Sequence, residues 1–209
     1  MAILSSLNKF TVPGANGQVE GLLMPKLKYR FRVLFTNFGT NTPSSHELTK
    51  QVMSAGRPQL TFENMELAVY NSKINYAGRY TWEAVQIVLR DDSSNSVSQL
   101  VASQIQKQFD FFEQSSAASG SDYKFQTDIE ILDGGNGTNV QVLETFQLYG
   151  CYIQQTQYQQ ADYKVSDPLD ITLTIKYDNA VQGTSPAASA GFGQSIGRTL
   201  GTIALGGIG

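Results

Sequence analysis

The chain has 209 residues, a formal net charge of -3, one cysteine and one histidine. This length fits one large domain or two small ones. A single cysteine excludes an internal disulfide framework, one Cys with one His excludes a Cys/His zinc site, and the negative charge argues against a broadly basic nucleic-acid-binding surface. Only 16% of the residues are charged, against roughly 25% in an average domain. Much of the polar surface must therefore be amide and hydroxyl, a composition that suits contacts with other protein.

Three parts are expected from the changes in composition. Residues 1–24 predict an N-terminal arm, residues 25–180 the main domain, and residues 181–209 a glycine-rich tail with eight glycines and no acidic residue. No apolar run is long enough for a membrane-spanning helix, and the first ten residues do not have the pattern of a secretory signal. We expect no membrane insertion by this chain.

The first half of the main domain predicts mostly extended structure. Residues 27–35 alternate apolar and basic side chains, which is typical of a strand. A loop is expected over 37–45, an extended segment over 47–70 broken by Gly56, Arg57 and Pro58, a long turn over 71–80, and a strand over 81–90.

One helix is predicted, over residues 97–113. Ser96 and Gln99 fit a capping box at its start. Apolar residues then recur at spacings of four and three, which gives a single stripe for core packing. The stripe comprises Val97, Val101, Ile105, Phe109 and Phe112.

Strands dominate the second half as well. Residues 123–132, 140–149 and 169–177 are expected to be strands, with a glycine-rich reversal at 133–137 and a glutamine-rich stretch at 152–161. One helix among many alternating strands indicates a mainly β fold, with an antiparallel sheet, sandwich or barrel.

Catalytic patterns are weak. His46 lies in an expected loop without a nucleophile elbow, and Cys151 has no second cysteine or basic cluster beside it, so it is interpreted as a small buried filler. Gly191, Gly193 and Gly197 have the wrong spacing for a dinucleotide loop. The protein is expected not to be an enzyme and to need no cofactor and no metal.

Charge is distributed unevenly along the chain. Residues 1–109 hold 11 Lys+Arg and 7 Asp+Glu, whereas residues 110–178 hold 3 and 11. Either exposed strand faces are simply solvated, or the molecule has one basic and one acidic surface, which would suit self-assembly around a channel.

Two segments carry a resemblance to a known family. The run from Asn71 to Thr81 reads NSKINYAGRYT, and it precedes an expected strand, Glu83 to Arg90, that is followed by the acidic pair Asp91-Asp92 and then the helix. Near the end, Leu148-Tyr149-Gly150 is followed, after a polar insert, by LDITLTIKYD over 169–178. Over residues 27–178 this pattern resembles the tail tube proteins of contractile-tailed (myovirus) bacteriophages.

The resemblance implies a structural virion protein. Such proteins form hexameric rings that stack into a tube, each subunit giving four strands to an inner β-barrel, and the tube conducts DNA into the host. Twenty-four strands at ~4.8 Å spacing and ~40° tilt give a barrel roughly 48 Å across, which leaves a channel of roughly 35–40 Å for duplex DNA. The implied partners are further copies of the chain, tail sheath, baseplate and tail terminator proteins, and duplex DNA in transit. The implied location is the tail of the virion, assembled in the host cytoplasm.

Two sets of site residues are expected. A polar, partly acidic wall should line the channel, because a wall of basic residues would retain DNA, while Lys28, Arg30 and Arg32 should face away from it. The lumen-facing set is Gln126, Asp128, Glu130, Thr145, Gln147, Asp170, Thr172 and Thr174. The resemblance also implies that the segment 47–80 is a long loop that reaches the adjacent ring, with the contact expected at Gly56, Pro58, Leu60, Phe62, Met65 and Leu67.

Two alternatives remain open. The first is a tube-like protein with the same fold, from a secretion system, a phage-tail-like bacteriocin or a baseplate. The second is a β-sandwich carbohydrate-binding module, in which a sugar platform would be formed by Tyr149, Tyr152, Tyr158 and Tyr163.

Overall fold

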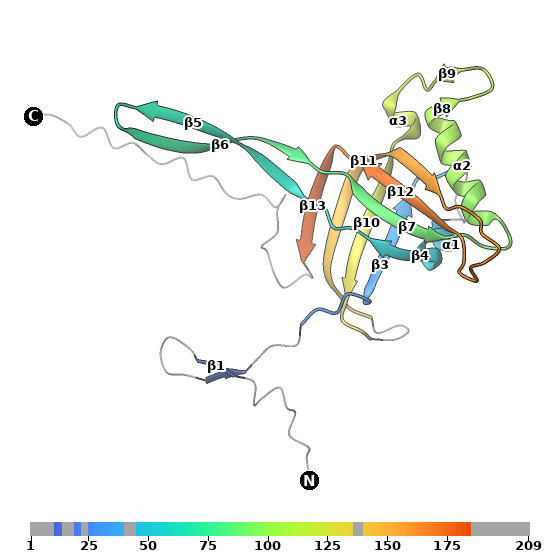
Figure 1. Ribbon diagram of the computed structural model, residues 1–209, viewed down its shortest axis with the longest axis horizontal. Coiled ribbons are helices and arrows are strands. Elements are labelled where there is room, and N and C mark those ends of the chain that lie inside the picture. Colours follow the sequence, from blue (N-terminus) through green and yellow to red (C-terminus); the bar gives the residue numbers. More distant parts are fainter. Residues whose placement is uncertain (1–10, 14–18, 22–24, 40–44, 136–139, 185–209) are drawn as a thin grey trace, which may run out of the picture.

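The computed structural model describes residues 11–13, 19–21, 25–39, 45–135 and 140–184. It confirms a mainly antiparallel β fold (Figure 1). The described helices are α1 (Ser45–Gln51), α2 (Ser96–Gln108) and α3 (Gly120–Tyr123). The described strands are β1 (Thr11–Pro13), β2 (Val19–Gly21), β3 (Phe31–Thr36), β4 (Val52–Ala55), β5 (Leu60–Val69), β6 (Ser72–Trp82), β7 (Val85–Arg90), β8 (Phe109–Asp110), β9 (Ser115–Ser116), β10 (Phe125–Leu132), β11 (Val142–Tyr158), β12 (Asp170–Lys176) and β13 (Asn179–Thr184).

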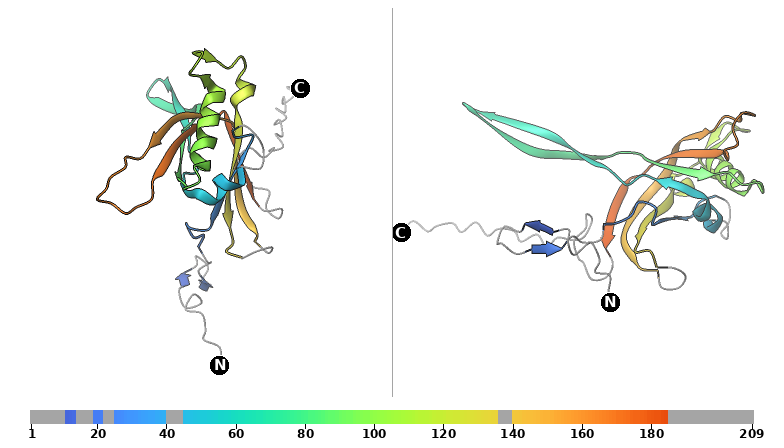
Figure 2. Two further views of the ribbon diagram at one scale, coloured as in Figure 1. Left: turned by 90° about the vertical axis from the view of Figure 1, so that its right-hand side faces the viewer. Right: turned by 60° about the horizontal axis from the view of Figure 1, so that its bottom comes forward.

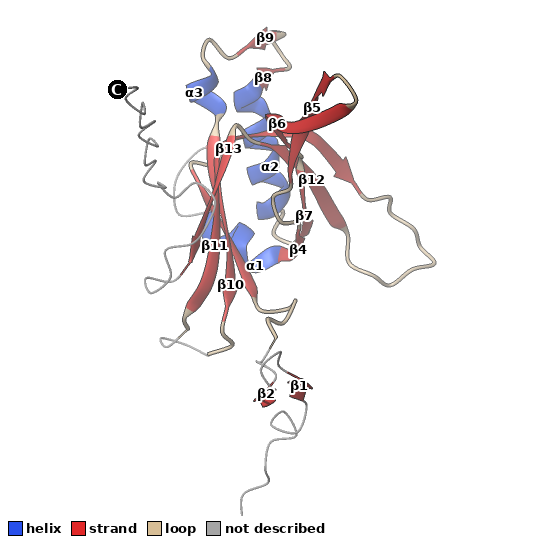
Figure 3. Ribbon diagram, turned by 90° about the vertical axis from the view of Figure 1, so that its left-hand side faces the viewer, coloured by secondary structure: helices blue, strands red, loops and turns tan. Residues whose placement is uncertain are grey.

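Seven strands form the body of the domain, in two layers that share β11. The first half of β11 pairs with β10 on one side and β13 on the other, and β10 also pairs with β3. The second half of β11 pairs with β12, which pairs with β7, which pairs with β4. We call the first layer the β3–β13 sheet and the second the β4–β12 sheet; Figure 3 shows them side by side.

The change of layer occurs at Gly150, in the middle of β11. Gly150 has φ +68, and a Cβ there would lie 2.2 Å from Oδ2 of Asp178. The neighbouring strand bends at the same level, because β12 ends at Lys176 and β13 begins at Asn179, with the Asp178 amide donating to the Tyr149 carbonyl. Glycine is therefore favoured here by the left-handed backbone conformation, and a Cβ would in addition displace the Asp178 side chain.

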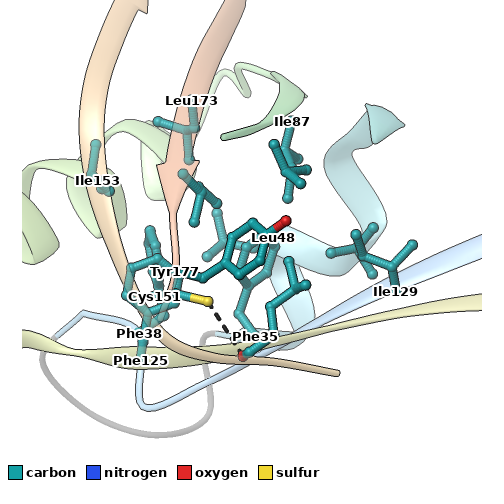
Figure 4. Packing of buried hydrophobic residues seen from close by; sticks show 14 of the residues in the cluster. Phe35, Phe38, Leu48, Ile87, Phe125, Ile129, Cys151, Ile153, Leu173 and Tyr177 are labelled. Atoms are coloured by element: carbon teal, nitrogen blue, oxygen red, sulfur yellow. Dashed lines mark hydrogen bonds between the residues drawn. The ribbon is translucent and has the colours of Figure 1, made fainter. Parts of the chain in front are cut away.

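The core lies between the two layers (Figure 4). Alternate residues of β10, β11 and β12 point into it, as the period-2 pattern predicts. Phe35, Phe38 and Phe125 form an aromatic cluster, in which the Phe38 and Phe125 rings are 4.9 Å apart, edge to face. Cys151 is buried in this core, its thiol donating to the Leu148 carbonyl at 3.3 Å, as the filler interpretation expected.

Helix α2 packs against the side of the domain opposite the projecting hairpin (Figures 1 and 2). Two of its glutamines hold it there. The Gln104 side chain is fully buried, accepting from the Gly39 amide and donating to the Tyr123 carbonyl. The Gln108 side chain exchanges two hydrogen bonds with the backbone of Ile153, as a neighbouring strand would.

Strands β5 and β6 form a hairpin that projects far beyond the body (Figures 1 and 2). It continues the β4–β7 pair past the Gly56–Pro58 break, where the Gly56 amide still bonds the Gln86 carbonyl. The long turn expected over 71–80 is wrong, since β6 covers nearly all of it and the reversal is confined to Tyr70 and Asn71. The Asn and Gly residues of this stretch favour turns locally, but its apolar and polar side chains alternate as in a strand.

The structure corrects several other boundaries. Residues 47–51 were expected to be extended, but they belong to helix α1. The same helix carries His46, which was expected in a loop. The strand expected over 27–35 is β3, and it begins only at Phe31. Tyr29 therefore lies outside it and is 72% exposed. Strand β11 runs on through the glutamine-rich stretch to Tyr158, and β13 runs to Thr184, inside the expected tail. The rest of the tail and most of the expected arm lie outside the described residues.

The helix prediction is right in place and wrong at both ends. The residue before α2 is Asn95 in a left-handed conformation, and the first turn is satisfied by the carboxylate of Asp92, not by Ser96. The helix ends at Gln108, so Phe109 and Phe112 leave the stripe, Phe112 with 95% of its surface exposed.

Candidate assembly surfaces

Three kinds of surface on the domain are suited to contact and have no partner among the described residues of one copy. They are the two edges of the β3–β13 sheet, the outer face of that sheet, and the β5–β6 hairpin. The two faces follow from the alternation of their strands, and the edges follow from the strand order.

The edges are the outer sides of β3 and β13. Among the described strands, β3 pairs only with β10, and β13 pairs only with β11. Each therefore presents a row of backbone N–H and C=O groups along one side. Such edges favour pairing with another strand.

The outer face of the β3–β13 sheet carries five of the residues expected to line a channel. Gln126, Asp128 and Glu130 alternate with buried residues on β10, and the same holds for Thr145 and Gln147 on β11. They also pair directly, Asp128 with Gln147 and Glu130 with Thr145, so they lie side by side. The structure thus brings this part of the set together.

The other three expected residues lie elsewhere. Asp170, Thr172 and Thr174 alternate outward on β12, which belongs to the β4–β12 sheet. The sequence patterns of β10 and β12 are equivalent, so alternation alone could not place them in different layers.

The expected separation of basic and acidic faces is wrong at Arg32. Arg32 is directly opposite Glu130 in the pairing of β3 and β10, and its guanidinium lies 2.5 Å from the Glu130 carboxylate. Strand pairing, which sequence alone did not give, puts the two charges together. The outward-pointing charges of the four strands are then Arg32, Asp128 and Glu130, one cation and two anions.

Among the described residues of this face, Asp128 is the charge without an ion pair. Its partial burial raises the pKa of the carboxyl, a hydrogen bond from Gln126 opposes that change, and the charge of Glu130 adds to it. Carboxylates that are held close together on a half-buried face resist ionisation in this way.

The hairpin has one apolar and one polar face. Residues that pair across the hairpin share a face, so Met65 lies beside Tyr76 and Leu67 beside Ile74. The apolar face comprises Met65, Leu67, Val69, Ile74 and Tyr76, each 49–57% exposed. On the opposite face Asn64 bonds Asn75 at 3.3 Å, and Lys73 lies 2.6 Å from Glu66.

The residues expected to contact an adjacent ring divide along this hairpin. Met65 and Leu67 belong to its apolar face, and Phe62 is exposed near its base, against the ring of Tyr80. Leu60 instead packs against the core, and Gly56 and Pro58 lie in the connection that precedes β5. Val69, Ile74 and Tyr76 were missed, although the alternation of Lys73, Ile74, Asn75 and Tyr76 would have indicated a strand.

A pocket opens between the two layers, on the half of the β3–β13 sheet formed by β10 and β3. It has a volume of about 780 Å³ and is lined by Ile129 and Ile131 of β10, Phe31 of β3, and Met53 and Ala55 of β4. Lys28 and Arg57 also line it and contribute two basic side chains. We call it the β3–β4 pocket.

The remaining chemistry is sparse. Within the described ranges no three His, Cys, Asp or Glu residues come together as metal ligands. Among the helices of the described part of the chain, none combines the length and apolarity required to span a bilayer. Of the tyrosines named for the alternative sugar platform, Tyr149 and Tyr158 are nine residues apart along β11, on opposite sides of the bend at Gly150.

Comparisons with solved structures agree with this geometry. No protein-family model and no curated protein matches the sequence. The tube-terminating cap of the anti-feeding prophage matches with a TM-score of 0.57 and 12% identity, over 82% of this chain and 99% of that one. The sheath/tube terminator of the PVC extracellular contractile injection system matches with a TM-score of 0.55 and 12% identity, over 78% and 100%. The SPP1 tail tube matches with a TM-score of 0.52 and 12% identity, over 77% and 80%.

These similarities establish the fold. The chain has the fold of tail tube and tube-terminator proteins of phage tails and contractile injection systems, which is the fold that the sequence resemblance implied.

Proposed function

We propose that the protein is a structural subunit that polymerises, as hexameric rings stacked into a tube, into the tail tube of a bacteriophage. The observation that carries this is the β3–β13 sheet, four strands that, within the described part of the chain, have two unpaired edges and a core on one face. Pairing β3 of one copy with β13 of the next extends the sheet without interruption. Six copies give the 24 strands of a barrel roughly 48 Å across.

The two faces of the sheet differ, and this difference decides which face would point toward the channel of such a ring. One face is covered by the β4–β12 sheet and α2, so the uncovered face is the one available to a channel. The lumen would then carry Gln126, Asp128, Glu130, Thr145 and Gln147, with Arg32 held by Glu130. Asp170, Thr172 and Thr174 would lie on the outside, toward the sheath.

The proposed cargo is duplex DNA in transit. Each subunit would place one cation and two anions on the wall, a net charge of about -1, so six subunits repel phosphate weakly and offer it few contacts. Asp128→Lys should convert this wall into one that retains DNA, with binding that falls steeply as salt rises. If D128K tubes bind linear duplex DNA no better than unmodified tubes, the lumen assignment is wrong.

Sedimentation velocity of the purified chain tests the assembly itself. We expect species of six subunits and larger to grow with concentration at native salt. A single species near the 22.9 kDa of one chain at every concentration would contradict the proposal. The remaining proposed partners are the sheath, baseplate and terminator proteins, and the proposed location is the virion tail, assembled in the host cytoplasm.

A second candidate differs only in cargo. Two of the matching structures are terminators of an anti-feeding prophage and an extracellular contractile injection system, so a tube of that kind is supported by the same fold. Nuclease-protected DNA in particles that contain the chain would separate the two, since a phage tail joins a DNA-filled capsid. In both cases the protein would act as a conduit and not as an enzyme.

A further inference from the structure

The edge strand β13 has little apolar packing on its inner face. Its residues lie directly opposite those of β11, so Ala180 and Gln182 share the buried face of Leu148 and Phe146. Ala180 offers the core a single methyl group, and Gln182 brings a polar amide to the same face. Beyond Ala180, this part of β13 therefore depends on its backbone ladder with β11 and on whatever its polar side chain can bind.

Glu144 provides that polar attachment. It precedes Phe146 on the inner face of β11 and is buried, with 6% of its surface exposed. One carboxylate oxygen accepts a hydrogen bond from the side-chain amide of Gln182. The other accepts from the ammonium group of Lys26 at 2.6 Å. Both oxygens of this buried carboxylate are therefore bound, each by a different segment of the chain.

The two partners of Glu144 belong to the two edges of the β3–β13 sheet. Gln182 lies on β13, and Lys26 lies in the segment that leads into β3. That segment passes the ends of β10 and β11, where the Arg30 guanidinium donates to the Asp133 carbonyl at 2.6 Å. One carboxylate in the middle of the sheet thus connects the edge strand on one side to the approach of the edge strand on the other.

The carboxylate is charged at neutral pH. Burial raises the pKa of Glu144, but the hydrogen bonds from Lys26 and Gln182 and the nearby charges of Lys26 and Arg57 outweigh this effect, so the pKa lies below its ordinary value. A hydrogen bond to a charged acceptor is shorter and stronger than one between neutral groups. The bond from Gln182 is therefore a strong attachment of β13 to the body of the domain.

We propose that Glu144 is the residue that positions β13 for pairing with β3 of the next copy. The inference rests on the proposed function and adds a positioning residue to it. Lys26 supplies the counter-charge that allows the carboxylate to be buried, and Gln182 extends the attachment to the edge. An edge that is already held in one conformation is ready to pair, whereas a frayed edge must first be ordered, which costs conformational entropy.

Three variants separate this role from general stabilisation. Glu144→Met and Gln182→Met both remove the bond to the edge, whereas Glu144→Gln keeps an acceptor for Gln182 and gives up only the charge. Replacing a buried ion pair by an apolar residue of similar size is often neutral or stabilising, so E144M should unfold at an unchanged or higher temperature.

Amide hydrogen exchange reports the edge directly. On the single subunit, at concentrations too low for assembly, the amides of β13 should exchange about tenfold or more faster in E144M and Q182M than in the unmodified chain. The amides of β10 should be unchanged, because β10 stays paired on both sides. A subunit of equal or greater stability with a faster-exchanging edge is the result that a purely stabilising role of Glu144 would not give.

Assembly should follow the edge and not the stability. E144M and Q182M should each need about a tenfold higher concentration to form rings or tubes, measured by sedimentation velocity, and E144Q should stay close to the unmodified chain. Gln106→Met is the matched control and should change neither readout, because Gln106 is exposed on α2 and bonds Asp110.

Unchanged exchange of β13 in E144M, normal assembly of E144M, or equal impairment of E144Q would each overturn the positioning role. The proposed function would survive those results. It would fail only if the unmodified chain did not assemble, a result that the exchange measurements on single subunits neither require nor mimic.

Discussion

Asp92 organises the start of α2 at the scale of single residues. Its carboxylate accepts hydrogen bonds from the hydroxyls of Ser94 and Ser96 and from the Val97 amide. These bonds lower the pKa of Asp92 to about 2, with the Ser94 bond contributing most. Because the folded pKa is depressed, this stabilisation is present above the ordinary value near 3.8 and is lost as pH falls toward 2.

We therefore expect Asp92→Asn to remove part of the acid dependence of stability between about pH 4 and pH 2. NMR titration of the Asp92 carboxyl should give a midpoint near 2, and Ser94→Ala should move it upward. A midpoint for Asp92 that is unchanged in the S94A variant would show that the hydroxyl does not hold the charge.

Gly150 carries the bend of β11. Alanine there would adopt a left-handed conformation at a cost of about 1–2 kcal/mol and would meet the side chain of Asp178. Urea unfolding of Gly150→Ala should show at least this loss. Gly183→Ala is the matched control, because a Cβ at Gly183 meets only the Thr145 carbonyl at 3.9 Å, and it should be neutral or mildly stabilising.

At the scale of elements, Gln108 joins α2 to the sheet. Its side-chain amide satisfies both backbone groups of Ile153 at the edge that β10 leaves free. Gln108→Ala should reduce the free energy of unfolding by about 1–3 kcal/mol, since two partly buried polar groups lose their partners. Gln106→Ala should cost less than about 0.5 kcal/mol, because Gln106 is exposed and bonds only Asp110; equal losses would refute the role of Gln108.

We expect that the hairpin can be removed without unfolding the core. Leu60 and Trp82 face each other at its base and belong to the packed interior. Replacing residues 61–81 by a two-residue Asn-Gly turn should leave a folded subunit with a similar melting temperature that no longer assembles. Tubes of normal length from the shortened chain would show that the hairpin is dispensable.

The elements that sequence predicted best are those with a single buried face. β10 and β12 alternate cleanly, and their inward residues are buried as expected. β6 was predicted as a turn because its Asn and Gly residues favour turns, although its side chains alternate, and α1 and the end of α2 were misplaced because local propensity competes there with packing. Alternation reports which side chains share a face, and it does not report the layer to which a strand belongs.

At the scale of the whole molecule, alternation therefore predicted only part of the candidate surfaces. The polar residue types on the outer face of the β3–β13 sheet were predictable, yet β12 lies in the other layer and Arg32 lies beside Glu130. Both results depend on long-range pairing, which the pattern of one strand does not contain. The edges of β3 and β13, unpaired among the described strands, and the β3–β4 pocket follow from the assembled topology alone.

The most direct test is a cryo-electron microscopy reconstruction of the polymer formed by the purified chain. The proposed function predicts a tube of six-subunit rings in which β3 of each subunit pairs with β13 of the next, with Asp128 and Gln147 facing an open channel. A reconstruction in which β3 and β13 remain unpaired between subunits, or in which α2 lines the channel, would contradict it.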